Sequence, residues 1–396
     1  MRILIAEDER ITRQSLLRQL ERWGHDVTAA EDGADAWRRF QEKEFDLVVT
    51  DWDMPNMDGR ELVEHIRQSD AASYIYLIML TGRSEKSDLV AGMEAGADDF
   101  LAKPFDRNEL RVRLKAGERI IQLERQLVSK NEALGSANDR MKRDLDAASA
   151  IQRNLLPQDL PVDVNAKFGW HFEPCDELGG DILNVVPIGD DEVAMYLLDV
   201  TGHGVPAALL SVTVSQVLNV RDPSSSILIA GQADGKPVSQ SPSDVLAYLN
   251  RQFPMASSGG KFMTMVYAVL NLRTGLLRYA NAGHPPPFLV RPGSNPEQLT
   301  GGNLPIGVIA DAEIEESSIE LQPGERVYLY SDGLSEAVNE EREMVQIEGL
   351  DRMIGRSQEG SLDDSIGRCV EELKAWCGTA PLTDDISLLA FELTRD

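Results

Sequence analysis

Carboxylates crowd together in one glycine-containing stretch, "EPCDELGGDILN" at residues 173–184. Glu173, Asp176, Glu177 and Asp181 fall within this stretch, and no Lys or Arg stands among them. Crowded carboxylates repel one another unless a cation neutralises them, and paired glycines let a backbone approach another group closely. The stretch therefore predicts a site for a divalent cation.

Carboxylates of the same kind recur at the tips of strand-length apolar runs farther along the chain. Asp199 closes "VAMYLLD", Asp332 follows "RVYLYS", and the pair Asp384 and Asp385 precedes "ISLLAFEL". Oxygen ligands alone favour Mg²⁺ or Mn²⁺ over zinc. Two such ions could lower the pKa of a water molecule and hold the oxygens of an in-line displacement at phosphorus, with no Ser, Cys or His nucleophile. We therefore expect Asp181, Asp199, Asp332 and Asp384 to form one catalytic site, with Asp385 as the alternative to Asp384.

A second set of reactive side chains lies in the first 118 residues. Glu7, Asp8, Asp51, Thr81 and Lys103 each stand at the end of an apolar run. Two or three carboxylates can hold Mg²⁺ beside an incoming phosphate, and a carboxylate can attack phosphorus to give an aspartyl phosphate. The lysine would neutralise the phosphoryl oxygens, and the threonine would donate a hydrogen bond to one of them.

The elements that must bring this second set together alternate between strands and helices. We expect buried strands at residues 2–6, 47–50, 75–80 and 98–102, and helices at 12–23, 34–41, 59–68 and 86–95. Such alternation is typical of a doubly wound α/β domain, in which ligands bind beyond the carboxyl ends of the strands. All five side chains stand at those ends, so the fold class predicts one shared crevice.

A long helix should follow, because residues 111–156 contain no proline. Along it an apolar or small residue recurs at every seventh position: Ile120, Leu127, Leu134, Met141, Ala148 and Leu155. This spacing predicts a coiled-coil linker over 119–156 and hence a homodimer, and a register with Asn131 and Asn138 in the seam would also favour two parallel strands. The other interpretation is one long helix packed on its own domains. Pro157 should end the helix.

The rest of the chain combines strands with a few helices. Residues 262–290 predict a hairpin around the turn "LRTG", and helices are expected at 207–220, 243–252 and 361–376. The economical architecture is an α+β sandwich with helices outside its sheets. The polar segment 221–244 is either a flap beside the site or a disordered insertion, and we favour the insertion.

Two histidines near the acidic turns have open roles. His203, in the turn after Asp199, could give a proton to a leaving group, because histidine titrates near neutrality. An ordinary polar turn residue is the alternative that we favour. His284, ahead of three prolines, is expected to fix a loop by hydrogen bonding.

Composition limits the classes of function. At 396 residues the chain suggests two or three domains. Its net charge of −27 argues against nucleic-acid binding. The apolar runs are too short to cross a bilayer, and the N-terminus lacks a signal-peptide pattern, so we expect a cytoplasmic protein without membrane contact. Cys175, Cys369 and Cys377 show no ligand spacing and should be reduced thiols.

The motifs "VVTDWDMPNMDG" (48–59), "LTGR" (80–83) and "LAKPF" (101–105) resemble the receiver domain of two-component response regulators. The resemblance covers residues 1–118 and implies phosphorylation by a sensor histidine kinase. Glu7 stands where many receivers have Asp, and it still supplies a carboxylate. The resemblance implies three groups of site residues: the phosphoacceptor Asp51; the Mg²⁺ ligands Asp8, Asp51 and the Asp53 carbonyl; and the switch residues Thr81, Phe100 and Lys103.

The motifs "DELGGD", "DVTGHGVPAAL", "NAGHPPP", "YSDGLSEA" and "TDDISLL" resemble the type-2C metal-dependent protein phosphatases, in the bacterial branch typified by SpoIIE and RsbU. We place this domain at residues 157–396. The resemblance implies two Mn²⁺ or Mg²⁺ ions and hydrolysis of phosphoserine or phosphothreonine on a protein. Its implied ligands are Asp199 on both ions, Asp332 and Asp384 on one, and Asp181 with the Val200 carbonyl on the other.

Together the two resemblances indicate a response regulator in which phosphorylation of Asp51 controls a protein phosphatase. They suggest a phosphorylated anti-sigma-factor antagonist of the STAS type as substrate. The alternative is a binding protein with a non-catalytic phosphatase-like domain that the receiver gates. A kinase is disfavoured, because the chain lacks a glycine-rich nucleotide loop followed by a lysine and a catalytic loop.

Overall fold

The computed structural model of the protein describes residues 1–69, 73–82, 93–158, 160, 165–219, 226–233 and 236–394. The chain divides into two units, Met1–Arg140 and Met141–Asp396, and each is described by itself. The helix expected at 86–95 lies largely outside the described residues.

A parallel sheet with strand order β2-β1-β3-β4-β5 forms the centre of the first unit. Its strands are β1 (Arg2–Ala6), β2 (Asp26–Ala30), β3 (Leu47–Asp51), β4 (Tyr76–Thr81) and β5 (Asp99–Ala102). The four expected strands are present, and their parallel pairing confirms the doubly wound fold. The sequence interpretation missed β2, because this edge strand mixes polar with small residues and contains no apolar run.

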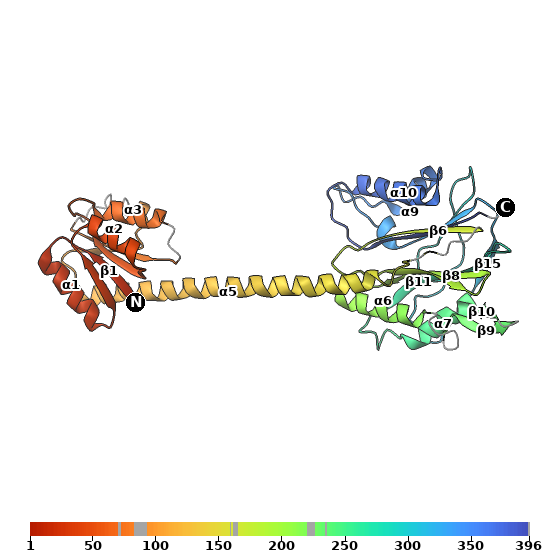
Figure 1. Ribbon diagram of the computed structural model, residues 1–396, viewed down its shortest axis with the longest axis horizontal. Helices are drawn as coiled ribbons and strands as arrows, with labels where there is room; N and C mark the ends of the chain where they lie inside the picture. Colours follow the sequence, from red (N-terminus) through yellow and green to blue (C-terminus); the bar gives the residue numbers. More distant parts are fainter. Residues whose placement is uncertain are drawn as a thin grey trace. The chain divides into compact units, whose positions relative to one another are not determined.

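Helices pack on both faces of this sheet (Figure 1). They are α1 (Arg10–Arg22), α2 (Gly33–Glu42), α3 (Gly59–Gln68) and the first turns of α5 (Arg107–Arg153). A capping box begins α3: the Asp58 carboxylate accepts the amide of Glu61, and the Glu61 side chain accepts the amide of Asp58. Gly59 is required there, because a Cβ atom would collide with the carbonyl oxygen of Asp51. The "MDG" turn thus ties the start of α3 to the end of β3.

Helix α5 is a single helix of 47 residues, which confirms the long helix expected from the sequence. Leu110 and Leu114, in its first turns, pack into the core of the first unit. It therefore begins before residue 119, where the linker was expected to begin. It ends ahead of Pro157, which cannot continue a helix.

The expected seam lies on the exposed part of α5. Leu127, Leu134 and Met141 are 54%, 68% and 59% exposed. Pairing with a second copy stays a prediction.

Two antiparallel sheets form the second unit, with strand orders β15-β12-β11-β8-β7 and β14-β13-β16-β17-β6. The first contains β7 (Ile182–Ile188), β8 (Glu192–Val200), β11 (Met263–Asn271), β12 (Leu276–Ala282) and β15 (Ser317–Glu320). The second contains β6 (Ala166–Glu173), β13 (Phe288–Val290), β14 (Glu297–Gln298), β16 (Arg326–Tyr330) and β17 (Ile386–Leu393). Strands β11 and β12 are the hairpin expected around "LRTG".

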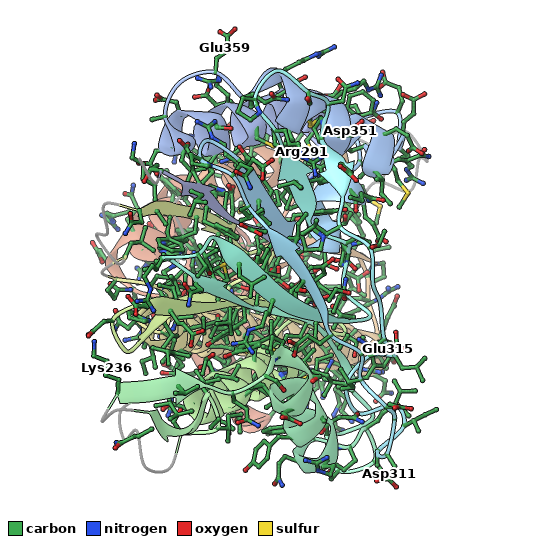
Figure 2. All side chains as sticks on the ribbon, turned by 90° about the vertical axis from the view of Figure 1, so that its right-hand side faces the viewer. Lys236, Arg291, Asp311, Glu315, Asp351 and Glu359 are labelled. Atoms are coloured by element: carbon green, nitrogen blue, oxygen red, sulfur yellow. The ribbon has the colours of Figure 1, made fainter. Side chains whose placement is uncertain are left out.

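The two sheets pack face to face, and helices cover their outer faces, which confirms the α+β sandwich. Side chains from both sheets, such as Leu197 and Phe391, share one buried cluster. Helices α6 (Val205–Val217) and α7 (Pro242–Gln252) lie on the first sheet, and α8 (Asp332–Ser335), α9 (Gln346–Arg356) and α10 (Leu362–Cys377) on the second. In Figure 2, Glu359 marks the side of α9 and α10, and Lys236 marks the opposite side.

The segment 221–244 is not a disordered insertion in its described part, so that expectation is wrong there. A hairpin of β9 (Ile229–Ala233) and β10 (Lys236–Ser239) occupies it, and α7 begins at its end. Ser239 is buried and accepts a hydrogen bond from Arg278 at 2.7 Å. Such contacts join residues that are distant in the sequence. They can fix the structure of a polar segment although its sequence shows no apolar pattern.

Among the described residues, no helix combines the length and the apolar character that crossing a bilayer requires.

Candidate metal sites

The four acids expected to form the catalytic site lie at strand ends of both sheets in the second unit. Asp181 directly precedes β7, and Asp199 stands next to the last residue of β8. Asp332 begins α8 just after β16, and Asp384 lies just before β17. Strands β7 and β8 are antiparallel neighbours, and so are β16 and β17, so each pair of strand ends meets. The charges of Asp332 and Asp384 act on Asp199, and that of Asp199 acts on Asp181, so the two pairs of strand ends are neighbours.

Burial and neighbouring charges shift the pKa values of these carboxyl groups upward. Burial raises the pKa of Asp181 well above its usual value, and the charge of Asp199 adds to the shift. Burial, with the charges of Asp332 and Asp384, raises the pKa of Asp199 to about 7. Burial, followed by the charge of Asp384, raises the pKa of Asp332 to about 6. Each carboxylate would be more stable with a cation beside it.

Within the described part of the chain, none of Asp181, Asp199, Asp332 and Asp384 forms an ion pair with a lysine or an arginine. A set of buried and partly buried oxygen donors without a lysine or arginine partner among the described residues fits Mg²⁺ or Mn²⁺.

Asp385 has a different environment from its neighbour Asp384. Its carboxylate accepts the backbone amides of Cys175 at 2.8 Å, Gly180 at 2.6 Å and Asp181 at 3.1 Å. Asp384 is only partly buried, and burial raises its pKa. The side chain of Asp385 thus holds the "DELGGD" turn, while that of Asp384 lies among the other acids.

Two further contacts fix the acidic turn. The Ser387 hydroxyl donates to the Asp181 carboxylate at 2.6 Å. A Cβ atom on Gly180 would come within 2.9 Å of the Val200 carbonyl oxygen and 3.1 Å of that of Gly202. Glycine is therefore needed where the turn approaches the end of β8, next to the carbonyl expected to bind an ion.

The two histidines lie in different environments. His203 is exposed, with its Nδ1 atom 3.6 Å from the Asp176 carboxylate. His284 is buried, its Nδ1 atom is 2.8 Å from the Thr264 hydroxyl, and burial lowers its pKa to about 3. The Asn281 side chain bonds both the amide and the carbonyl of His284, so this residue fixes a loop as expected.

Sequence reasoning did not name Cys175 or Gln152 as residues beside the cluster. The ligand atoms of Cys175, Asp384 and Asp385 lie within 4.8 Å of one another, and burial raises the pKa of the Cys175 thiol to about 12. Gln152, at the end of α5, contacts the turn through Gly179. Only Cys175 gave a usable signal, since it stands within the acidic stretch itself.

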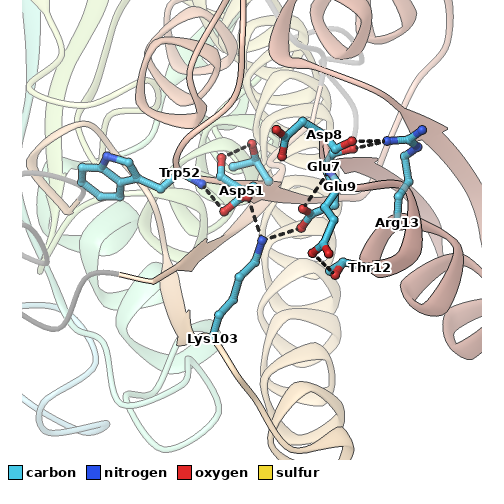
Figure 3. A network of polar contacts seen from close by, with 9 residues as sticks. Glu7, Asp8, Glu9, Thr12, Arg13, Asp51, Trp52 and Lys103 are labelled. Carbon is cyan, nitrogen blue, oxygen red and sulfur yellow. Dashed lines mark hydrogen bonds and ion pairs between the residues drawn. The ribbon is translucent and has the colours of Figure 1, made fainter.

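The second expected site lies at the carboxyl ends of β1, β3 and β5 in the first unit (Figure 3). Lys103 donates from Nζ to Asp51 and to Glu7, at 2.7 Å in each case. Carboxylate oxygens of Glu7, Asp8 and Asp51 lie within 4.8 Å of one another, which suits a cation with oxygen ligands. The Trp52 amide donates to Asp51 Oδ1 at 2.8 Å and orients that carboxylate.

The side chains around Lys103 carry more negative charge than this lysine can neutralise. Burial raises the pKa of Glu7, and the charge of Asp51 adds to the shift, while Lys103 offsets part of it. Burial lowers the pKa of Lys103, but hydrogen bonds to Asp51 and Glu7 outweigh burial, so the net shift is upward. One ammonium group therefore serves two acids, and the exposed Asp8 adds a third.

The remaining expected residues of this unit lie around the same strand ends. Thr81 is buried at the end of β4, and Phe100 is partly buried on β5. Asp53 is exposed in the loop after β3.

Two family models match the chain. The model described as Stage II sporulation protein E (SpoIIE) matches residues 189–394, more than half of the chain. The model described as a response regulator receiver domain matches residues 3–115.

Curated relatives match the first unit. The phosphate regulon transcriptional regulatory protein PhoB of Escherichia coli (strain K12) is 38% identical over 115 residues, 29% of this chain and 50% of PhoB. The response regulator MprA of Mycobacterium avium (strain 104) is 40% identical over 116 residues, 29% of this chain and 50% of MprA. The chain thus spans about half the length of these relatives.

A solved structure matches the second unit. The SiaA-PP2C domain of Pseudomonas aeruginosa has a TM-score of 0.53 and 24% sequence identity, covering 65% of this chain and 98% of that domain. At this level of identity the likeness concerns the fold.

Proposed function

The chain belongs to the SpoIIE family, with a response regulator receiver domain ahead of a PP2C-type phosphatase domain. From this premise we propose that it is a phosphorylation-controlled protein phosphatase. Phosphorylation of Asp51 controls the metal-dependent hydrolysis of phosphoserine or phosphothreonine on a partner protein. One observation carries the proposal: buried Asp181 and partly buried Asp199, Asp332 and Asp384 stand at strand ends without a lysine or arginine ion-pair partner in the described part of the chain. Burial raises the pKa of each, and the charge of another acid of the set adds to the shift for Asp181, Asp199 and Asp332.

The acids divide between two ions, Mn²⁺ or Mg²⁺. The charges of Asp332 and Asp384 both act on the carboxyl group of Asp199, and Asp181 forms a hydrogen bond with it. Contact with acids of both pairs suits a ligand shared by both ions. Asp332 and Asp384 would hold one ion, and Asp181 with the Val200 carbonyl would hold the other. Asp384 is preferred over Asp385, because the oxygens of Asp385 already accept three amides. When bound, the ions supply an activated water molecule and stabilise charge on the phosphoryl oxygens.

Protein groups around the acids orient these ligands. The Ser387 hydroxyl fixes one oxygen of the Asp181 carboxylate. Asp385 holds the amides of the turn that carries Asp181, so its role is to position a ligand.

The receiver accepts a phosphoryl group on Asp51 from a sensor histidine kinase in the cytoplasm. Glu7, Asp8, Asp51 and the Asp53 carbonyl provide the Mg²⁺ site. Lys103, which already contacts Asp51, neutralises the added charge. Thr81 and Phe100 respond to the phosphoryl group.

We assign the receiver to residues 1–118, the linker to 119–156 and the phosphatase to 157–396. Helix α5 runs unbroken from the core of the first unit toward the second and exposes an apolar seam, which supports a homodimer through a coiled coil. Two receiver states that favour different arrangements of this helix would change phosphatase activity.

The proposed substrate is a phosphorylated anti-sigma-factor antagonist of the STAS type, by resemblance to the SpoIIE and RsbU branch. The competing function is a binding protein whose receiver gates a domain without turnover.

Hydrolysis of p-nitrophenyl phosphate and of a phosphorylated antagonist, with and without Mn²⁺, separates the two functions. The wild type should hydrolyse both in Mn²⁺ and lose the activity in a chelator, and Asp199→Asn should lack it. Equal rates for wild type and Asp199→Asn would favour the binding protein.

A further inference from the structure

Gln152 is a buried polar residue near the end of a helix whose neighbouring side chains face water. It is 3% exposed, whereas Ile151 is 64% exposed. Its Nε2 atom donates to the carbonyl oxygen of Gly179 at 2.7 Å, and its Oε1 atom accepts the amide of Gly179 at 3.3 Å. One carboxamide thus satisfies both polar groups of one glycine.

Gly179 stands two residues before Asp181 in the acidic turn. The next two amides, those of Gly180 and Asp181, donate to the Asp385 carboxylate. The backbone of the turn is therefore held by two side chains, Gln152 on α5 and Asp385 just before β17. A Cβ atom on Gly179 would lie 2.7 Å from Asp385 Oδ2, so the backbone fits closely between its two holders.

A second contact joins the same region to the helix end. The side-chain amide of Asn184, on β7, donates to the carbonyl oxygen of Leu155 at 3.3 Å. The last turn of α5 thus contacts the residues before Asp181, and Leu155, just after α5, contacts the strand that follows Asp181.

We propose that Gln152 is a positioning residue for the metal site: it fixes the Gly179 backbone and through it the Asp181 carboxylate, so that the end of α5 sets the affinity for the ion that Asp181 holds. The inference rests on the proposed function. It adds to that function a defined contact between the connecting helix and one ligand.

The chemistry requires a carboxamide. Glutamate has the same shape but presents an oxygen to the Gly179 carbonyl oxygen, where two acceptors repel each other. Leucine has a similar volume but leaves both groups of Gly179 unpaired.

The test uses the full chain with Asp51→Ala throughout, so that the receiver ion does not contribute. Gln152→Glu and Gln152→Leu are compared with Gln158→Glu. Gln158 donates to the carbonyls of Arg153 and Leu156, both at 3.0 Å, so it closes the same helix end through other groups. Calorimetry measures Mn²⁺ binding to the metal-free proteins, and circular dichroism checks the fold.

Both Gln152 variants should raise the dissociation constant of one Mn²⁺ ion by roughly 10–100-fold, as is usual when a group that orients a metal ligand is lost, and the control should change it far less. Unchanged affinity in the folded Gln152 variants, or an equal loss in the control, would overturn the inference. If Gln152→Glu does not fold, Gln152→Leu decides. Absence of Mn²⁺ binding in the parent protein would instead overturn the proposed function itself.

Discussion

The carboxylate of Asp385 accepts the backbone amide of Gly180 at 2.6 Å, across 205 positions of the sequence. This bond joins the start of the last strand to the first acidic turn. The two adjacent acids of "TDD" therefore have different roles: Asp385 holds backbone amides, whereas Asp384 faces the cluster of acids. That difference is directly testable.

Asp385→Asn should destabilise the second unit, because an amide group cannot accept all three backbone donors. Loss of a hydrogen bond to a buried donor costs about 1–3 kcal/mol. Urea unfolding of the metal-free protein measures the change. Asp384→Asn should leave that stability unchanged or higher, since it removes a repulsive charge, and should weaken Mn²⁺ binding. The reverse pattern would make Asp385 the ligand.

The raised pKa values of Asp199 and Asp332 predict how stability depends on pH without metal. Their pKa values in the folded state, about 7 and about 6, exceed the ordinary value of 3.8. The folded state therefore binds more protons than the unfolded state between these limits, and stability falls as pH rises through them.

The melting temperature of the metal-free second unit should fall by roughly 3–10 °C from pH 5 to pH 8, and Mn²⁺ should reverse the fall. Calorimetric melting at several pH values measures both effects. Asp199→Asn should flatten the metal-free profile. A profile of equal slope in the variant would assign the pH dependence to other groups.

Lys103→Met should destabilise the receiver, because Glu7 and Asp51 then lie together without a cation. Removing one partner of a buried ion pair costs about 3–5 kcal/mol, and the partial exposure of Lys103 reduces this to about 1–3 kcal/mol. Mg²⁺ should recover more stability in the variant than in the wild type. Unfolding with and without Mg²⁺ tests the expectation, and an undiminished stability would contradict the role of Lys103 as counter-ion.

Leu127→Asp should convert the expected dimer to a monomer, because a charge in an apolar seam opposes pairing. Ser129→Asp, two positions away on another face of α5, is the matched control. Sedimentation equilibrium measures the mass of each protein. A monomeric wild type, or a dimeric Leu127→Asp, would remove the coiled coil from the account.

Much of the fold could be predicted because buried strands leave apolar runs. The runs at 2–6 and 47–50 became β1 and β3, and the acids after them met at one end of a parallel sheet. Strand β2 escaped prediction, because an edge strand with one half-buried face needs few apolar residues. Helix α9 was also missed, since its neighbours in sequence show no capping residue at its start.

The candidate sites could be predicted only as far as residue type and strand position allow. Asp181 and Asp199 were found because acids at strand tips are chemically conspicuous. The contact of Gln152 with Gly179 depends on how a helix end packs against a turn 27 positions away, and a single glutamine in a helix gives no sign of it. The choice between Asp384 and Asp385 likewise depends on which one faces the amides.

Whether the clustered acids form a catalytic metal site can be decided by counting the Mn²⁺ ions bound to wild type and to Asp199→Asn by electron paramagnetic resonance, beside the hydrolysis of a phosphoserine protein. We expect the variant to lose both phosphatase ions and the activity together, while it keeps the ion of the receiver. A variant that binds as many ions with the same affinity, or that hydrolyses the substrate at the wild-type rate, would contradict this expectation.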